Sequence, residues 1–191
     1  MADPHAESWA KAVELLDSRY AFIGVTRRSS PEWWLDVASL IRGQSQDPRG
    51  WRALDPYEGE IGLERPAAPH PWIDPPETPE DVQRFDAMVR ELPRSSARSL
   101  LVVLAIPGMD VAKAWDWEGQ RVRLEGRADT LLSRFPAGTR FYSNIGWKGE
   151  QPDFYEQPVT GMHQFSHDLW DAGLIAVNAD EVGLFWTFES L

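Results

Sequence analysis

The chain has 191 residues, of which 42% are apolar, and its formal net charge is −11. This length suits one domain of ordinary size, and the apolar fraction excludes wholesale disorder. The negative charge argues against nucleic-acid binding through clustered cations and against anionic membrane surfaces, and it favours a basic protein partner.

Cysteine is absent from the sequence, which excludes disulfides and thiolate metal sites and fits a reducing cytoplasm. The first residues lack the basic and apolar regions of a signal peptide, so we expect none. The longest apolar run, Leu100 to Ile106, is too short to cross a bilayer. Together these features predict a cytoplasmic protein.

The N-terminal part predicts a helix, a strand and a second helix. Pro4 to Asp17 has apolar residues at helical spacing behind the capping residue Asp3. Tyr20 to Thr26 is rich in strand-forming residues, and Pro31 to Ile41 again has helical periodicity. These segments predict elements that alternate without a regular β-α-β rhythm.

Residues 42–77 hold seven prolines, which disfavour both a helix and a central strand. Two interpretations compete: a long loop wrapped over the domain and pinned by Trp51, Tyr57 and Trp72, or a linker between two small domains. The aromatic residues favour the wrapped loop, because linkers seldom need large apolar anchors.

The middle of the chain predicts a helix followed by a buried strand. Thr78 supplies a helix cap before Pro79, and apolar spacing continues to Leu92. Residues 99–106 are apolar on both faces, as in a central strand buried on both sides. A short helix, a strand, a helix and a strand are then expected at the following ranges: 111–115, 121–125, 128–135 and 140–145.

The C-terminal part predicts a helix over Thr160 to Ala172 and a strand hairpin that turns at 178–181. In the last strand, alternation puts Val182 and Trp186 on one face and Phe185 on the other. The whole pattern predicts a single α+β domain over residues 1–191, with a mostly antiparallel sheet whose central strand is 99–106.

Charge is unevenly distributed along the chain. Residues 53–81 carry eight acidic side chains and one basic one, and residues 149–191 carry eight acidic side chains and no lysine or arginine. Two acidic blocks therefore flank a mildly basic middle. An acidic surface can simply maintain solubility, or it can attract a basic partner and accelerate the encounter.

One histidine pair deserves consideration as a metal site. On the predicted helix His163 and His167 are four residues apart, a spacing at which both can bind one ion. Asp171 would lie about 12 Å from His163 along the helix axis, which is too far for the same ion. A third ligand would have to come from elsewhere, such as His70. A metal-dependent hydrolase is therefore an alternative, beside the plainer interpretation of two solvated histidines.

Other catalytic signatures are missing. The sequence has no Gly-x-Ser-x-Gly elbow, no Gly-x-Gly-x-x-Gly loop and no Walker loop. Asp116 and Glu118 alternate with Trp115 and Trp117, and we expect an exposed turn whose tryptophans fold back onto the core. No cofactor is predicted.

The ten tryptophans are the remaining signal, because tryptophan is a favoured anchor at protein interfaces. Most must belong to the core, and one or two exposed ones beside carboxylates would suit a basic partner. A third hypothesis has tryptophans lining a pocket in a small-ligand-binding structural subunit. The ending Val182 to Glu189 and the general profile resemble bacterial immunity proteins, which are small, acidic, cytoplasmic α+β proteins that neutralise a toxin.

The preferred hypothesis is therefore an immunity-type binding protein that occludes a basic toxin or effector. Its carboxylates would mimic phosphates, and the contact surface is expected in the last acidic block. The predicted contact residues are two aromatic anchors and seven carboxylates: Trp147, Tyr155, Glu150, Asp153, Glu156, Asp168, Asp171, Asp180 and Glu181.

Overall fold

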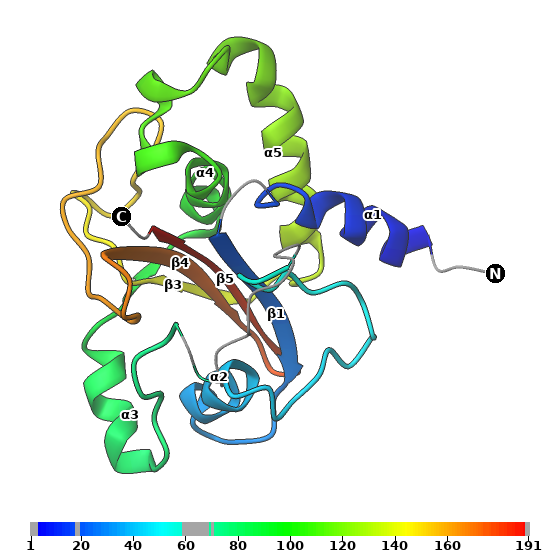
Figure 1. Cartoon of the computed structure of the whole chain (residues 1–191), viewed down its shortest axis with the longest axis vertical. Coiled ribbons are helices and arrows are strands. Elements are labelled where there is room, and N and C mark those ends of the chain that lie inside the picture. The colour runs from blue at the N-terminus through cyan, green and yellow to red at the C-terminus, as the bar shows by residue number, and fades with distance from the viewer. Residues whose placement is uncertain (1–3, 18–19, 59–68, 70, 190–191) are drawn as a thin grey trace.

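A five-stranded antiparallel sheet organises the protein (Figure 1). The computed structural model describes residues 4–17, 20–58, 69 and 71–189. The strand order is β1-β5-β4-β3-β2, and every neighbouring pair is antiparallel. The five strands have these bounds: β1 Tyr20–Arg27, β2 Arg90–Leu92, β3 Arg140–Ser143, β4 Trp170–Val177 and β5 Glu181–Glu189.

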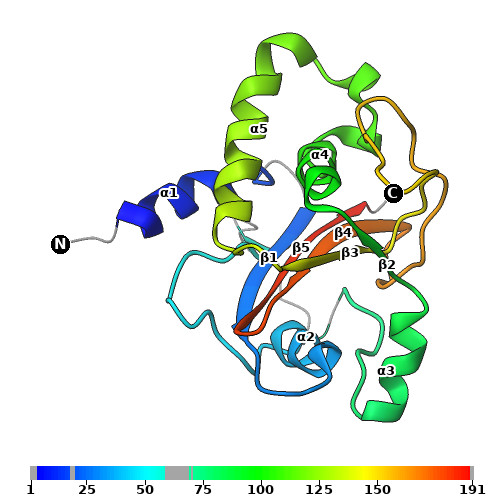
Figure 2. The same ribbon diagram turned by 180° about the vertical axis from the view of Figure 1, so that it is seen from behind.

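Helices cover both faces of the sheet, as Figures 1 and 2 show from opposite sides. On one face lie α1 (Pro4–Val13), α4 (Arg94–Leu104) and α5 (Trp117–Ser133), and on the other α2 (Trp33–Ile41) and α3 (Pro79–Asp86). Two short 3-10 turns, η1 (Pro107–Met109) and η2 (Val111–Lys113), connect α4 to α5. No helix of the described residues has the length and apolarity needed to cross a membrane. The predicted α+β class is confirmed.

The predicted C-terminal hairpin is also confirmed, and it forms the centre of the sheet. β4 pairs with β5 from Trp170 opposite Glu189 to Val177 opposite Val182. Alternation along β5 sends Trp186 into the apolar cluster beneath α2 and α3, and Phe185 into the cluster beneath α1, α4 and α5. Both faces of these strands are therefore buried, which explains their nearly continuous apolar sequence.

The buried run 99–106 was predicted as the central strand, and that prediction is wrong. Residues 99–104 belong to α4, whose last turns are buried on every side between the sheet and α5, and residues 105–106 follow the end of the helix. A short run that is apolar all round suits a fully buried helix as well as a buried strand, so periodicity cannot separate the two. The polar residues 94–96, which precede the run, form the first turn of the helix.

The strand predicted at 121–125 is likewise wrong, because these residues lie within α5. The buried stripe of α5 is Leu124, Ala128 and Leu131, which recur at helical spacing. Val122, whose alternation with charged neighbours suggested a strand, lies on the outer face and is exposed.

The helix start at Thr78 is confirmed. Its hydroxyl accepts a hydrogen bond from the Asp81 amide, and the Asp81 carboxylate accepts one from the Thr78 amide, which completes a capping box. α3 ends at Asp86, earlier than the predicted Leu92, and residues 90–92 form β2. In the described parts of 42–77, Trp51 packs on Trp9, and Trp72 packs on Trp186.

Candidate partner-binding groove

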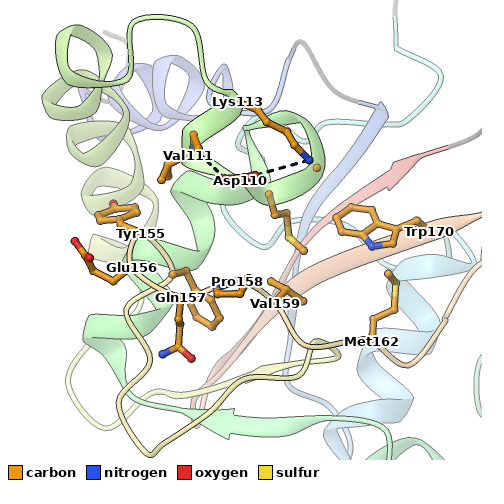
Figure 3. A pocket seen from close by; sticks show the side chains of 15 residues that line it. Asp110, Val111, Lys113, Tyr155, Glu156, Gln157, Pro158, Val159, Met162 and Trp170 are labelled. Atoms are coloured by element: carbon orange, nitrogen blue, oxygen red, sulfur yellow. Dashed lines mark hydrogen bonds and ion pairs between the residues drawn. The ribbon is translucent and has the colours of Figure 1, made fainter.

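An open groove of about 570 Å³ lies where the segment between α4 and α5 meets the long loop before β4 (Figure 3). We call it the connector groove. Its first wall is 108–113, its second wall is 154–162, and Trp170 lies at the start of β4. Ligand sites in proteins commonly measure about 300 to 1,000 Å³, so the groove has the size of a binding site.

The first wall follows an unusual backbone path. Gly108 has φ +65° and Met109 has φ +49°, in the left-handed region that most side chains avoid. Among the described residues, Met109 and Asp116 are the two non-glycine residues with positive φ, and both lie between α4 and α5. Such conformations cost about 1 to 3 kcal/mol and cluster at functional sites.

Apolar side chains form one side of the connector groove. Met109 is buried, whereas Val159, Met162 and Trp170 are half-buried and pack against the core cluster beneath α4. Figure 3 shows Val159, Met162 and Trp170 along the same side of the groove. Methionine side chains are flexible, so this surface can accommodate apolar side chains of different shapes.

Charged groups border this apolar surface on both walls. The Asp110 carboxylate accepts a hydrogen bond from the Ala112 amide at 3.0 Å, which fixes its position on the first wall. The Lys113 ammonium lies 3.7 Å from the other carboxylate oxygen of Asp110. Glu156 is exposed on the second wall, and the Glu189 carboxylate accepts a hydrogen bond from the Gly108 amide at 3.4 Å.

The second wall is pinned to the core by two aromatic residues. Trp147 is only 5% exposed and packs edge-on against Phe154, with ring centroids 6.1 Å apart. The Arg90 guanidinium lies 4.2 Å from the Trp147 ring centroid and donates a hydrogen bond to the Trp147 carbonyl at 3.0 Å. Trp147, a predicted contact anchor, is therefore a core residue that holds the wall in place.

The other predicted anchor, Tyr155, is half-buried. Its ring packs against Trp117 at 5.0 Å, and the Arg121 guanidinium lies 4.9 Å from the Tyr155 ring centroid. Burial raises the pKa of the Tyr155 hydroxyl, with the nearby Glu125 carboxylate adding to the effect. The phenol is therefore neutral at physiological pH and adds no charge to the groove.

The seven predicted carboxylates differ in exposure and in position. Glu150, Asp153 and Glu156 are exposed on the loop that forms the second wall, and Asp168 is half-buried. Asp171 and Glu181 are buried, at 0% and 7% exposure, which contradicts their prediction as surface contacts. Each of the two has protein partners that replace water.

Asp180 is exposed, but it lies at the opposite end of the hairpin from the groove. It occupies the turn between β4 and β5, whereas the groove reaches the first residue of β4. Eight residues of strand span about 25 Å, so Asp180 lies about one strand length from the end of the groove at Trp170. The acidic block that is continuous in sequence is divided by the hairpin.

Asp171 explains why residues 160–172 do not form the predicted helix. One of its carboxylate oxygens accepts hydrogen bonds from the Phe165 amide, the Ser166 amide and the Ser166 hydroxyl at 2.8–3.0 Å. The other accepts from Asn144 Nδ2 at 3.1 Å and Trp186 Nε1 at 3.0 Å. These bonds fix a loop over 163–169, and β4 begins at 170.

We predict that this buried carboxylate makes stability depend on pH. Burial raises the pKa of Asp171 above its usual 3.8, against the lowering effect of its hydrogen bonds. A carboxyl group with a raised pKa in the folded state stabilises the protein below its unfolded-state pKa, and this stabilisation is lost as pH rises through the folded-state value. Each unit by which the folded-state pKa exceeds the unfolded-state pKa corresponds to about 1.4 kcal/mol of unfolding free energy.

The check is urea unfolding of the wild-type protein and of Asp171→Asn between about pH 3.5 and pH 7, with pH bounds chosen around the usual carboxyl pKa. The stability of the wild type relative to the variant should be greatest at the acidic end and should fall as pH rises. A difference that grows with pH would contradict the raised pKa.

The two histidines of the predicted metal site do not lie on a helix. His163 and His167 are both exposed in the loop before β4, so the i, i+4 geometry on which the metal site depended is wrong. Within 4–17, 20–58, 69 and 71–189 no group of three or more His, Cys, Asp or Glu side chains is arranged to hold a metal ion. His70, the suggested third ligand, lies outside the described residues.

Sequence reasoning missed the first wall and one exposed tryptophan. Trp115 is 83% exposed, contrary to the expectation that both tryptophans of this turn fold back onto the core. Its carbonyl accepts a hydrogen bond from Gln120 Nε2 at 2.7 Å, and Asp116 next to it has φ +48°. The spacing of Trp115 and Trp117 was the available signal. Residues two positions apart on a helix point to different sides, so both tryptophans cannot point inward.

Comparison with protein-family models, curated proteins and solved structures finds no match to this chain. The features of this chain that bear on function are the groove, its charges and the exposed side chains around it.

Proposed function

We propose that this protein binds a basic protein partner and occludes part of its surface, as an immunity-type inhibitor does with a toxin or effector in the cytoplasm. One observation carries the proposal: three exposed carboxylates, Glu150, Asp153 and Glu156, lie on the loop that also forms the second wall of the connector groove. The partner surface is correspondingly expected to combine cations with an apolar contact.

The chain as a whole favours such an encounter. With a net charge of −11 it attracts a basic protein over distances of about one Debye length, which is about 10 Å at 0.1 M salt. The backbone of this loop loses little conformational entropy on binding, because Trp147 and Phe154 already hold it against the core. A surface of this kind resembles a row of phosphates to a nucleic-acid-binding cleft.

Reversing or removing the three negative charges of the loop that carries Glu150, Asp153 and Glu156 should slow association. We expect the variant Glu150→Lys, Asp153→Asn, Glu156→Lys to associate at least about tenfold more slowly at low salt, because the carboxylates steer the encounter. Asparagine at 153 retains the side-chain oxygen that accepts the Tyr155 amide. The partner is first captured from a lysate of the native host, and association rates of the purified pair are then measured at about 0.1 M and about 1 M salt.

The matched control changes net charge equally at other exposed positions, with Glu32→Gln, Asp74→Lys and Asp180→Lys. These side chains lie outside the connector groove, so association should slow much less. Equal slowing in both variants would mean that only net charge matters, and no slowing in either would exclude the acidic loop as the contact surface. Thermal melting of each variant verifies that it folds.

A further inference from the structure

The charge pattern around the connector groove suggests which part of a partner it receives. The apolar surface of Met109, Val159, Met162 and Trp170 offers burial to an apolar side chain. Asp110 and Glu156 border this surface from opposite walls. An uncharged apolar occupant would desolvate these carboxylates without compensation, and an acidic one would be repelled.

Among the described residues that line the groove, Lys113 is the one lysine or arginine. Its ammonium lies 3.7 Å from an Asp110 carboxylate oxygen, and its side chain is 65% exposed. The lysine passes over Gly108, where an added Cβ would lie 3.4 Å from the ammonium. An exposed ion pair at this distance contributes little stability, so another cation can replace Lys113 at small cost.

From these contacts we infer that the connector groove binds a cationic amphipathic segment of the partner, in which lysine or arginine alternates with apolar residues. The apolar side chain occupies the surface formed by Val159, Met162 and Trp170, and a cation of the segment takes the place of Lys113 beside Asp110. This inference rests on the proposed function and adds the chemistry of the recognised segment.

The probe is a fluorescein-labelled octapeptide of alternating lysine and leucine, added to the full chain and followed by fluorescence anisotropy at low salt. A lysine–serine octapeptide carries the same charge without the apolar side chains, and a glutamate–leucine octapeptide carries the opposite charge. We expect the lysine–leucine peptide to bind at least about tenfold more tightly than either, because only it satisfies both the apolar surface and the carboxylates.

Two substitutions at the same ion pair should act in opposite directions. Lys113→Ala frees Asp110 and is expected to tighten binding of the lysine–leucine peptide by about threefold, the scale of an exposed ion pair. Asp110→Asn retains an oxygen for the Ala112 amide but removes the charge, and it should weaken binding by a similar factor. Val159→Ser should weaken the lysine–leucine peptide without changing binding of the lysine–serine peptide.

The matched control is Lys148→Ala, which removes the same charge from an exposed residue outside the groove. Equal tightening by Lys113→Ala and Lys148→Ala would overturn the inference, because only net charge would then matter. Equal affinity for the lysine–leucine and lysine–serine peptides would also overturn it, as would no binding of either peptide.

Failure of the inference and failure of the proposed function give different results. If the peptide results are negative while the loop variant still slows association of the captured partner, the partner binds the acidic loop and not the groove. If loop variant and control behave alike in the partner assay, the proposed function itself is wrong.

Discussion

Replacing Arg134 with alanine is expected to lower the free energy of unfolding by about 3 to 5 kcal/mol, the usual cost of removing one partner from a buried ion pair. Its side chain is 0% exposed and donates hydrogen bonds to both carboxylate oxygens of Glu181 and of Asp47, at 2.6–3.1 Å. Trp9 and Trp51 enclose the guanidinium, with ring centroids 4.9 and 5.0 Å from its carbon.

The reason is that alanine leaves two carboxylates without their principal cation in a poorly solvated site. Arg49 also approaches Glu181, at 3.3 Å, but its side chain is much more exposed. Lysine would not replace Arg134, because one ammonium cannot donate paired bonds to two carboxylates. Arg134→Lys should therefore also destabilise the protein.

Urea unfolding followed by tryptophan fluorescence measures the change, and the free energy is obtained by linear extrapolation. Arg98→Ala is the comparison, because Arg98 pairs with Asp129 at 2.7 Å on a partly exposed surface and should contribute at most about 1 kcal/mol. Equal losses for the two variants would contradict the assigned importance of the buried network.

Part of the fold could be predicted from the sequence, where local signals agree with one another. The C-terminal hairpin was predictable, because strand alternation and a turn at 178–181 agree with each other. The helix start at Thr78 was predictable because its signals are local. The run 99–106 was not, since a fully buried segment lacks the polar face that reveals its period.

Spatial grouping of charge was less predictable than secondary structure. The acidic residues after Lys148 are neighbours in sequence, yet β4 carries Asp180 and Glu181 to the far end of the sheet. The first wall of the groove comes from 108–113, which no sequence pattern linked to the acidic loop. Exposure along a loop depends on which of its residues the core binds, here Trp147 and Phe154.

The second large effect is expected at Asp171. We predict that Asp171→Ala lowers the free energy of unfolding by at least about 3 kcal/mol, because removal of the carboxylate leaves several buried donors unpaired. The donors come from four residues in three separate segments of the chain: Asn144, Phe165, Ser166 and Trp186. Urea unfolding at neutral pH gives the global change.

Hydrogen exchange of the Phe165 and Ser166 amides gives the local change, and both should exchange faster in Asp171→Ala than in the wild type. Asp171→Asn retains one acceptor oxygen and should lie between the two. If these amides exchange at wild-type rates in the alanine variant, the carboxylate does not hold the loop.

Asp171 and Arg134 lie at opposite ends of the hairpin, so their loss should affect the groove differently. Asp171 is next to Trp170, so loss of its hydrogen bonds should loosen one end of the connector groove as well as the loop. Arg134 binds Glu181 at the opposite end of the hairpin, so Arg134→Ala should destabilise the fold without a selective effect there. Under conditions where both variants remain folded, peptide binding should therefore fall for Asp171→Ala and not for Arg134→Ala.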